Sequence, residues 1–519
     1  MNLFHCQVIL TENAVISEKD FVSGLQDARR HQLARLSGFL QHGAVTAFGL
    51  DHDFASISSL DMFRQRVPLR SYEDMTPYID RVISGERNVL FSGDPHCYLS
   101  SSGSTSGRAK VLPMSYDYFA DIYTPFLHLY MSALKRDCPD IARDWDATIN
   151  FKWDPLYRPA TLANGEQHLG VSQVDLARGF NAEGVSEPGT ASPWSCVPAD
   201  IDCLLERLYY RVRFAAGADI RQIVGINPAI IAALPDLIND RAERLINDLA
   251  TGSYDGVEVG APEMMLARRL SHAREQHDRL LPRHLWPNLQ RLLCWDQGIA
   301  GVYLPAIVPL YGDDCEVVPA PLGASESPLA ISLPTHGIRH VLTYRSSFYE
   351  FIDVQDDRER PLLLDELKPG AHYRVVVSHH SGLYRYVIGD IVKVSGYIGQ
   401  APTLAYCGRY NVDDALPESR LIDAVAIAVQ DTGLSIRNFT FRHHQGALQL
   451  QVEPDASTRH ALSGGGQRRF LQAVNGRLGR AAIDSVQVED SGAFSASWMN
   501  RVRSGLRPPQ VKDRVWNGL

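Results

Sequence analysis

Residues 100–110 are serine, threonine, glycine and alanine, apart from an arginine and a lysine at the end of the segment. Short apolar segments, 97–99 before it and 111–114 after it, predict two extended strands joined by a loop. Glycines let backbone N–H groups approach an anion, hydroxyls donate further hydrogen bonds, and a lysine adds positive charge. The composition favours a loop that wraps a polyphosphate, with a flexible surface loop as the alternative.

This loop is not a phosphate-binding loop of the Walker type. The spacing of Gly103, Gly107 and Lys110 does not fit the pattern G-x-x-x-x-G-K-[ST]. Pro113 also opposes the helix that a Walker loop opens, because proline disfavours helical backbone before it. A polyphosphate would therefore have to be held by a different loop architecture.

Length, composition and charge describe an ordinary globular chain. Its 519 residues favour two or more domains, and 45% apolar with 21% charged residues are typical of soluble proteins. A formal net charge of −9 argues against a nucleic-acid partner. The start lacks the pattern of a signal peptide, no apolar run approaches membrane length, and the cysteines have no zinc-like spacing. We therefore expect a cytoplasmic protein without a membrane partner.

Alternating helices and short apolar strands predict an α/β core in the first part of the chain. Buried strands are expected at 292–294 and 317–318, on either side of a helix at 301–311. The dipeptide Asn227-Pro228 predicts a helix start, and Pro235 is expected to interrupt that helix. The aromatic-rich segment 116–134 is expected to be helical, its rings forming either core or ligand wall.

Beyond residue 338 the sequence becomes rich in β-forming residues. Strands are expected at 341–344, 349–352, 373–377 and 383–394. A smaller α+β part follows, starting near Arg409, with a helix near 421–429 and an alternating strand at 448–452. The predicted domains are a large one at 1–404 and a small one at 405–519.

Three further segments carry residues suited to nucleotide chemistry. Residues 323–328 form a small-residue turn with one carboxylate, which could hold magnesium or be a solvated turn. Residues 381–390 end in Gly389-Asp390, which predicts a strand presenting a carboxylate at its end, suited to a ribose, or else an ordinary hairpin. Arg409 could pair with a phosphate or be a surface cation. The pairs 379–380 and 443–444 are histidines, but neighbours on a strand point to opposite faces and cannot easily share one metal.

In this order, the segments resemble the Gretchen Hagen family of plant acyl acid amido synthetases and their bacterial relatives, a branch of the adenylate-forming enzymes. The family motif S-S-G-T-S-x-G-x-x-K is matched by residues 101–110, with Ser104-Thr105 where Thr-Ser is usual. The motif Y-A-S-S-E is matched in part by residues 322–326, and Y-R-x-x-x-G-D by residues 384–390. The resemblance runs from about Gln32 to Arg409.

The resemblance implies an α/β fold with a large N-terminal adenylate-forming domain, built of a β-barrel and α/β sheets, and a small mobile C-terminal α+β domain. It implies an ATP-dependent ligase that uses magnesium, activates a carboxylic acid as acyl-AMP, and transfers the acyl group to an amine, usually an amino acid. The acid pocket is expected from 116–134 and 295–303.

The implied site residues fall into three groups. The ATP-binding group is Ser101, Ser102, Gly103, Ser104, Thr105, Ser106, Gly323, Ala324, Ser325 and Asp390, of which 323–325 would flank the adenine and Asp390 would hold the ribose. The catalytic group is Lys110, Arg409 and Arg507, with Arg409 at the hinge of the small domain, and the metal ligand is Glu326.

Two positions depart from the family pattern. The tyrosine that opens the second motif is Leu322 here, and the C-terminal K-x-P-R has its nearest match in residues 507–510, where Arg507 replaces the lysine. Arginine keeps the charge but not the compact head of lysine, so Lys512 is a possible substitute. The alternatives are an acyl-CoA ligase and a non-catalytic nucleotide-binding homologue.

Overall fold

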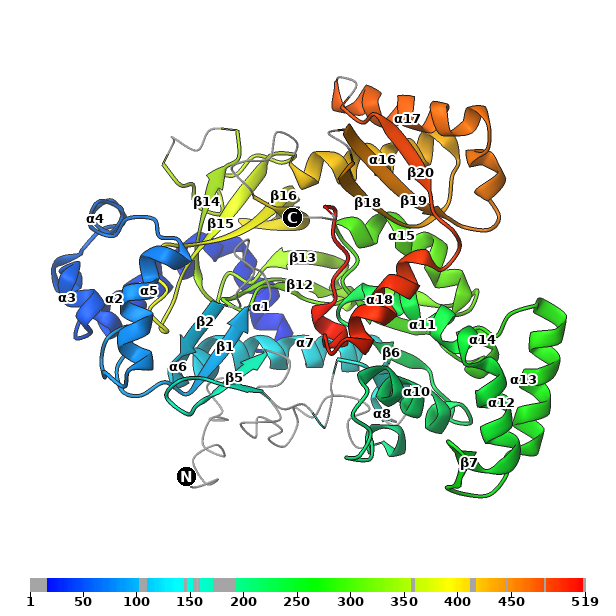
Figure 1. Ribbon diagram of the computed structural model, residues 1–519. Helices are drawn as coiled ribbons and strands as arrows, with labels where there is room; N and C mark the ends of the chain where they lie inside the picture. The colour runs from blue at the N-terminus through cyan, green and yellow to red at the C-terminus, as the bar shows by residue number, and fades with distance from the viewer. Residues whose placement is uncertain are drawn as a thin grey trace. The chain divides into compact units, whose positions relative to one another are not determined.

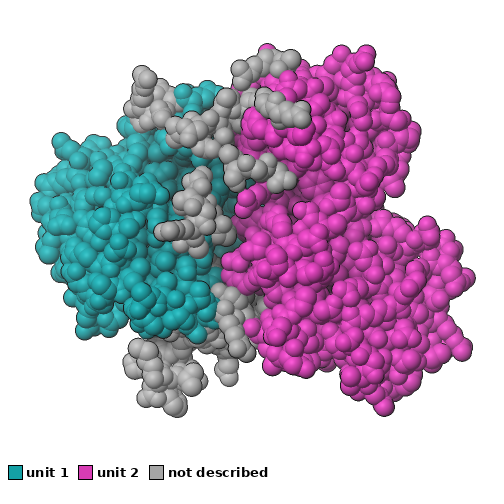
Figure 2. All heavy atoms as spheres, in the orientation of Figure 1, with its two compact units in different colours: residues 1–139, 157–187, 321–412 teal, residues 140–156, 188–320, 413–519 magenta. Residues whose placement is uncertain are grey.

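The computed structural model describes residues 16–101, 110–143, 147–152, 156, 159–170, 192–355, 360–410, 417–444, 447–479 and 482–516. The chain forms two compact units, shown in Figure 2. Unit 1 comprises Met1–Pro139, Tyr157–Glu187 and Pro321–Val412, and unit 2 comprises Asp140–Leu156, Pro188–Ala320 and Asp413–Leu519. The predicted domains, 1–404 and 405–519, divide the chain at a single point, whereas each unit combines three segments. The predicted division stays a prediction.

Unit 1 begins with helices, and serine residues cap the starts of several of them. Ser17 caps the first of them, because its hydroxyl accepts the N–H of Asp20 at 3.1 Å. Ser71 and Asp74 form a capping box at the start of α5. The helices are α1 Glu18–Gly24, α2 Ala28–Gly43, α3 Ala47–Asp51, α4 Leu60–Arg66, α5 Tyr72–Ile83, α6 Tyr116–Tyr118 and α7 Thr124–Asp137, with a π-helical turn at Phe119–Tyr123. The expected helix over 116–134 is confirmed.

The first sheet of unit 1 has the order β2-β1-β5-β4. Strand β1 pairs antiparallel with β2 and parallel with β5. Its strands are β1 Cys97–Ser101, β2 Lys110–Met114, β4 Ala160–Thr161 and β5 Gln167–Gly170. The two expected strands around residues 102–109 are therefore confirmed, while the loop itself lies outside the described residues.

The second sheet of unit 1 is antiparallel, in the order β11-β12-β13-β17-β16-β15-β14. Five of its strands, β12 to β16, are labelled in Figure 1. Its strands are β11 Leu322–Gly323, β12 Pro328–Leu333, β13 Ile338–Leu342, β14 Phe348–Asp353, β15 His372–Ser378, β16 Tyr386–Ile398 and β17 Ala401–Arg409. Each of the four strands expected between residues 341 and 394 has a counterpart here. Most valines, isoleucines and tyrosines of these strands are buried, which is the usual reason such residues form strands.

Unit 2 contains a parallel sheet in the order β10-β9-β6-β3. Its strands are β3 Thr148–Asn150, β6 Gln222–Val224, β9 Arg291–Cys294 and β10 Glu316–Pro319. The helices of this part are α10 Leu204–Ala215, α11 Pro228–Asp240, α12 Ala242–Thr251, α13 Met264–His277, α14 Pro282–Leu285 and α15 Ile299–Ile307, with a hairpin of β7 Ser253–Tyr254 and β8 Val257–Glu258. A parallel sheet with connecting helices confirms the expected α/β core.

The helix at Pro228 does not stop at Pro235, so that expectation was wrong. Proline has no N–H and should leave the carbonyl of Ile231 without its helical partner. The hydroxyl of Tyr311 donates to this carbonyl at 2.5 Å. A tertiary hydrogen bond therefore replaces the missing helical one, and α11 continues to Asp240.

The C-terminal residues of unit 2 form a sheet in the order β18-β19-β20 (Figure 1). Helices α16 and α17 share a buried apolar cluster with β18 and β19, including Val425, Phe470 and Leu450. The elements are α16 Glu418–Thr432, β18 Ile436–His444, β19 Ala447–Pro454, α17 Gly465–Leu478, β20 Ser485–Val488 and α18 Ala493–Arg503. The expected α+β C-terminal part is confirmed. No described helix has both the length and the hydropathy that crossing a membrane requires.

Candidate functional site

The two ends of the loop are held together by the sheet. Ser101 is the last residue of β1 and pairs directly with Lys110, the first residue of β2. Ser101 is buried, with 4% of its surface exposed. The other predicted loop ligands, Ser102, Gly103, Ser104, Thr105 and Ser106, lie outside the described residues.

Lys110 is seated between two tyrosines that the sequence interpretation did not include. Its Nζ donates to the hydroxyl of Tyr386 at 3.1 Å. The same Nζ lies 5.4 Å from the ring centre of Tyr72, within cation–π range. Burial raises the pKa of Tyr386, so its hydroxyl stays neutral and accepts from the ammonium. The position of Tyr386 inside the third motif was the signal that could have revealed this role.

The turn between β11 and β12 carries the second motif. A Cβ on Gly323 would lie 3.2 Å from the carbonyl oxygen of Ser327, so glycine permits the tight crossing of the chain. Ala324 donates its N–H to that same carbonyl at 3.0 Å. The hydroxyl of Ser325 donates to the carbonyl of Ser100 at 3.1 Å. These contacts place the turn against the end of β1, close to where the loop begins.

Glu326 is the buried carboxylate of this turn, with 3% of its surface exposed. Burial raises its pKa above the ordinary value, and the charge of Asp390 acts in the same direction. The charges of Lys110 and Arg409 oppose that shift. Glu326, Lys110, Asp390 and Arg409 therefore lie close enough to interact electrostatically, although they come from four separate segments of the sequence.

Asp390 is not at the end of its strand, which corrects the expectation from the sequence. Strand β16 runs on to Ile398. Arg374 of β15 pairs with Ile391, but Val376 pairs with Val387, so β16 carries extra residues in a bulge here. Gly389 adopts a φ of +88° within that bulge. The bulge places Asp390 opposite Arg409 of β17, with Oδ1 3.4 Å from Nε.

The first two residues of the third motif hold the fold rather than line the site. The hydroxyl of Tyr384 donates to the carbonyl of Phe39 in α2 at 2.9 Å. Arg385 is buried and donates through Nε to Glu350 at 2.8 Å, and Arg64 of α4 donates to the other oxygen of that carboxylate at 2.8 Å. These bonds fasten the helices of unit 1 to the seven-stranded sheet.

The paired histidines 379 and 380 follow β15 and have different partners. His379 is completely buried, and its Nε2 lies 3.0 Å from the carbonyl oxygen of Glu326. His380 bonds through Nε2 to Asp121 at 2.6 Å, and Arg35 donates to the same carboxylate oxygen at 2.6 Å. Among the residues that the structure describes, no group of three or more His, Cys, Asp or Glu side chains is arranged to hold a metal ion.

Arg507 and Lys512, the two candidates for the family's C-terminal lysine, lie in unit 2. Arg507 donates through Nε to Gln510 at 3.2 Å and is not in a helix or strand. Lys512 lies with its Nζ 4.9 Å from the ring centre of Trp295, which follows β9. The neighbouring Asp513 is held by Tyr303 at 2.6 Å and by Asn438 at 3.0 Å.

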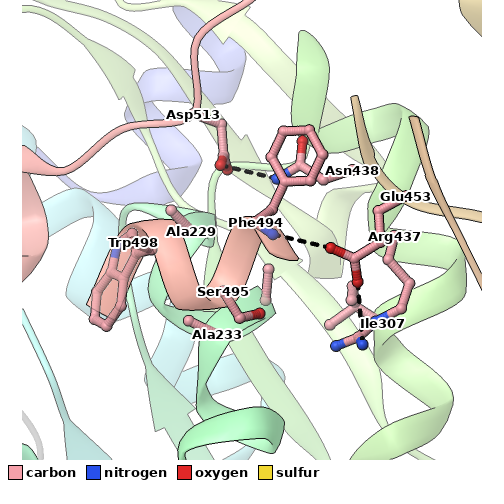
Figure 3. Close-up of a pocket in the computed structure, with 11 residues that line it drawn as sticks. Ala229, Ala233, Ile307, Arg437, Asn438, Glu453, Phe494, Ser495, Trp498 and Asp513 are labelled. Atoms are coloured by element: carbon pink, nitrogen blue, oxygen red, sulfur yellow. Dashed lines mark hydrogen bonds and ion pairs between the residues drawn. The ribbon is translucent and has the colours of Figure 1, made fainter. Parts of the chain in front are cut away.

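Figure 3 shows a small cavity within unit 2, next to Asp513. Residues of α11, α15 and α18 and of strands β18 and β19 line it, including Arg437, Glu453 and Trp498. Of the described residues around it, none is a predicted site residue. Arg437 forms ion pairs with Glu453 at 3.2 Å and with Asp236 at 2.8 Å. These ion pairs link the C-terminal sheet to helix α11 inside unit 2.

The fold is that of the acyl acid amido synthetases. The solved structure of the GH3.15 acyl acid amido synthetase superimposes with a TM-score of 0.77 at 20% sequence identity, covering 97% of this chain and 95% of that one. A second structure, AtGH3.15 acyl acid amido synthetase in complex with 2,4-DB, also gives 0.77, at 18% identity over 100% of this chain and 95% of that one.

The family is shown by the sequence match. The GH3 family N-terminal domain matches residues 18–315, and the GH3 family central domain matches residues 340–409. The chain belongs to the GH3 family, as the motifs indicated. It is 24% identical to the 4-substituted benzoates-glutamate ligase GH3.12 of Arabidopsis thaliana, over 73% of this chain and 70% of that protein. It is 23% identical to the probable indole-3-acetic acid-amido synthetase GH3.1 of Oryza sativa subsp. japonica, over 72% and 65% respectively.

Proposed function

We propose that this protein is an ATP-dependent ligase that joins a carboxylic acid to an amine, with an amino acid as the amine. In the first step a carboxylate oxygen attacks the α-phosphorus of ATP, the bond to pyrophosphate breaks, and acyl-AMP forms. In the second step the amine nitrogen attacks the acyl carbon, loses a proton, and AMP leaves. The observation that carries the proposal is the cluster of Lys110, Glu326, Asp390 and Arg409 beside the ends of the hydroxyl-rich loop. The relatives of the chain are named as an acid–glutamate ligase and as a probable amido synthetase.

Phosphoryl chemistry needs positioned groups that neutralise developing negative charge, and the cluster offers them. Lys110 would meet the phosphates together with the predicted loop ligands, and Arg409 would pair with a phosphate. Asp390 would accept hydrogen bonds from the ribose. Gly323, Ala324 and Ser325 would lie along the adenine, where their small size leaves room for a flat ring. Arg507 would approach from the C-terminal part, with Lys512 as the alternative cation.

The residues fit a magnesium ion that arrives with ATP. Magnesium bound to a nucleotide needs only one or two protein carboxylates, since phosphate oxygens and waters complete its shell. Glu326 is a buried carboxylate whose charge is disfavoured both by burial and by Asp390, so a nearby cation would relieve both costs. Glu326 would therefore hold the ion, which neutralises phosphate charge when bound.

The decisive experiment is pyrophosphate release from ATP and magnesium across a panel of aryl, indolyl and aliphatic acids, with and without pooled amino acids. We expect acid-dependent release, an amide only when amine is present, and loss of release in Asp390→Asn. Thiol-dependent turnover without amine would instead indicate an acyl-CoA ligase. ATP binding without release for any acid would identify a non-catalytic homologue, which Leu322 and Arg507 would help to explain.

The pH dependence of nucleotide binding should report the raised pKa of Glu326. Cation binding needs the ionised carboxylate, so the magnesium-dependent part of ATP affinity should disappear as pH falls through a value above the ordinary 4.5. Without nucleotide, the stability of the fold should depend on pH in the opposite direction to ATP affinity. The native state binds the proton of Glu326 more tightly than the unfolded state does. Glu326 thus contributes stability below pH 4.5 that is lost as pH rises through the raised pKa.

The measurement is ATP affinity against pH, with and without magnesium, for wild type and Glu326→Gln. The variant controls for protonation of ATP itself. Equal pH profiles for the two proteins would contradict the assignment of Glu326 as the metal ligand.

A further inference from the structure

His379 occupies a fully buried position directly after β15, and both of its ring nitrogens have partners. Its Nδ1 accepts the backbone N–H of Ser381 at 3.2 Å. Because Nδ1 accepts, the ring proton resides on Nε2, which donates to the carbonyl of Glu326 at 3.0 Å. Burial lowers the pKa of His379 to about 3, so the ring is neutral near neutral pH and its tautomer is set by these two bonds.

The contact of His379 falls on the peptide of the proposed metal ligand itself. The hydroxyls on either side of Glu326 are bonded elsewhere: Ser325 to the carbonyl of Ser100 and Ser327 to the hydroxyl of Ser347 at 2.8 Å. At Glu326 the carbonyl receives His379 and, at a longer 3.5 Å, the hydroxyl of Tyr118. His379 therefore makes the shorter of these two side-chain contacts, which fix the peptide from which the Glu326 side chain departs.

The short segment 379–381, which contains His379, also contacts the end of the strand that begins at Lys110. The hydroxyl of Ser381 accepts the backbone N–H of Ser115 at 2.9 Å and lies 3.1 Å from the hydroxyl of Ser115. Ser115 directly follows β2, which begins at Lys110. One side of the segment thus contacts the end of β2, and the other contacts the turn of Glu326.

We propose that His379 is a positioning residue that holds the Glu326 peptide, and so aims its carboxylate at the cation that accompanies ATP. This inference rests on the proposed function, because it assigns a support to the site proposed there. His379 acts through Glu326 and touches neither substrate nor metal. Losing a residue that orients a metal ligand typically lowers metal affinity by about 10- to 100-fold, which sets the size of the expected effect.

The variants separate positioning from packing. His379→Leu removes both hydrogen bonds while keeping an apolar side chain in the buried position. His379→Gln retains one N–H donor and one acceptor, and is the conservative variant. His42→Gln is the matched control, because His42 is exposed and pairs with the half-exposed Asp117.

The measurement is the affinity for α,β-methylene-ATP by calorimetry, once with magnesium and once with EDTA. The dissociation constant in EDTA divided by the one with magnesium gives the contribution of the cation to binding. We expect His379→Leu to lower this ratio by about tenfold and to leave affinity in EDTA within about twofold. His379→Gln should recover most of the ratio, and His42→Gln should match wild type.

Three outcomes would overturn the inference. They are an unchanged ratio in His379→Leu, an equal loss of affinity in EDTA accompanied by a lower melting temperature, and a wild type whose nucleotide affinity does not respond to magnesium. Failure of the proposed function looks different. A wild type that binds the nucleotide with magnesium, but releases no pyrophosphate from ATP with any acid, would refute the ligase and still leave the ratio to decide the role of His379.

Discussion

Replacement of Lys110 by methionine is expected to lower the rate of acid-dependent pyrophosphate release by about 100- to 1,000-fold, the usual cost of losing one preorganised charge-stabilising group. The ammonium is held in place by the hydroxyl of Tyr386 and by the ring of Tyr72. It therefore needs little reorganisation to meet phosphate charge. The measurement is the initial rate with the best acid of the panel, for variants whose circular dichroism matches wild type.

Two further variants sharpen this prediction. Tyr386→Phe removes the hydroxyl that accepts from Lys110 but keeps the ring, so a smaller loss of about tenfold is expected. Lys368→Met removes a lysine from an exposed position of unit 1 and should leave the rate unchanged. A Lys110→Met protein that keeps more than a third of the wild-type rate would refute the assignment of this lysine to the phosphates.

Replacement of Glu350 by glutamine is expected to destabilise unit 1 by about 3–5 kcal/mol, because removing one partner of a buried ion pair leaves uncompensated charge. Only 1% of the Glu350 side chain is exposed, and the pairing side chains of Arg64 and Arg385 are 10% and 5% exposed. Arg385 also donates to the backbone of Val67 at 2.8 Å, so the network joins β14 and the third motif to the segment after α4.

The free energy of unfolding by urea, with nucleotide absent, measures this effect. Glu86→Gln is the control, because it breaks the exposed pair of Glu86 with Arg81 and should not shift the transition. An Arg385→Met variant should lose stability in the same way as Glu350→Gln. If either variant folded as stably as wild type but lost nucleotide affinity, the third motif's arginine would belong to the site instead of the framework.

Local patterns in the sequence were enough for much of the fold. Asn227-Pro228 predicted a helix start, the β-forming residues after residue 338 predicted the strands there, and short apolar runs at 292–294 and 317–318 predicted two buried strands. These features depend on residues a few positions apart, whose side chains choose the backbone conformation directly. The motif order also indicated the family, since that information is linear.

The composition of the site depended on residues distant in sequence. The residue patterns alone offered Lys110, Glu326, Asp390 and Arg409 as separate charges, and the resemblance implied that they share one site. The fold shows that their charges interact. The third motif contains residues that hold the framework and residues that belong to the charged site. Its Tyr384 and Arg385 hold helices α2 and α4, while its Asp390 and Tyr386 face the charged cluster.

Residue types and their spacing were therefore sufficient to predict the strands, the helix starts and the family of this chain. The tertiary structure decided how far α11 extends, because the hydroxyl of Tyr311 supplies the bond that Pro235 cannot make. It also decided that Asp390 projects from a bulge and that His379 supports Glu326. Each of these outcomes turns on a hydrogen bond or strand pairing between segments that only the folded chain brings together, and a pattern of neighbouring residues carries no record of such partners.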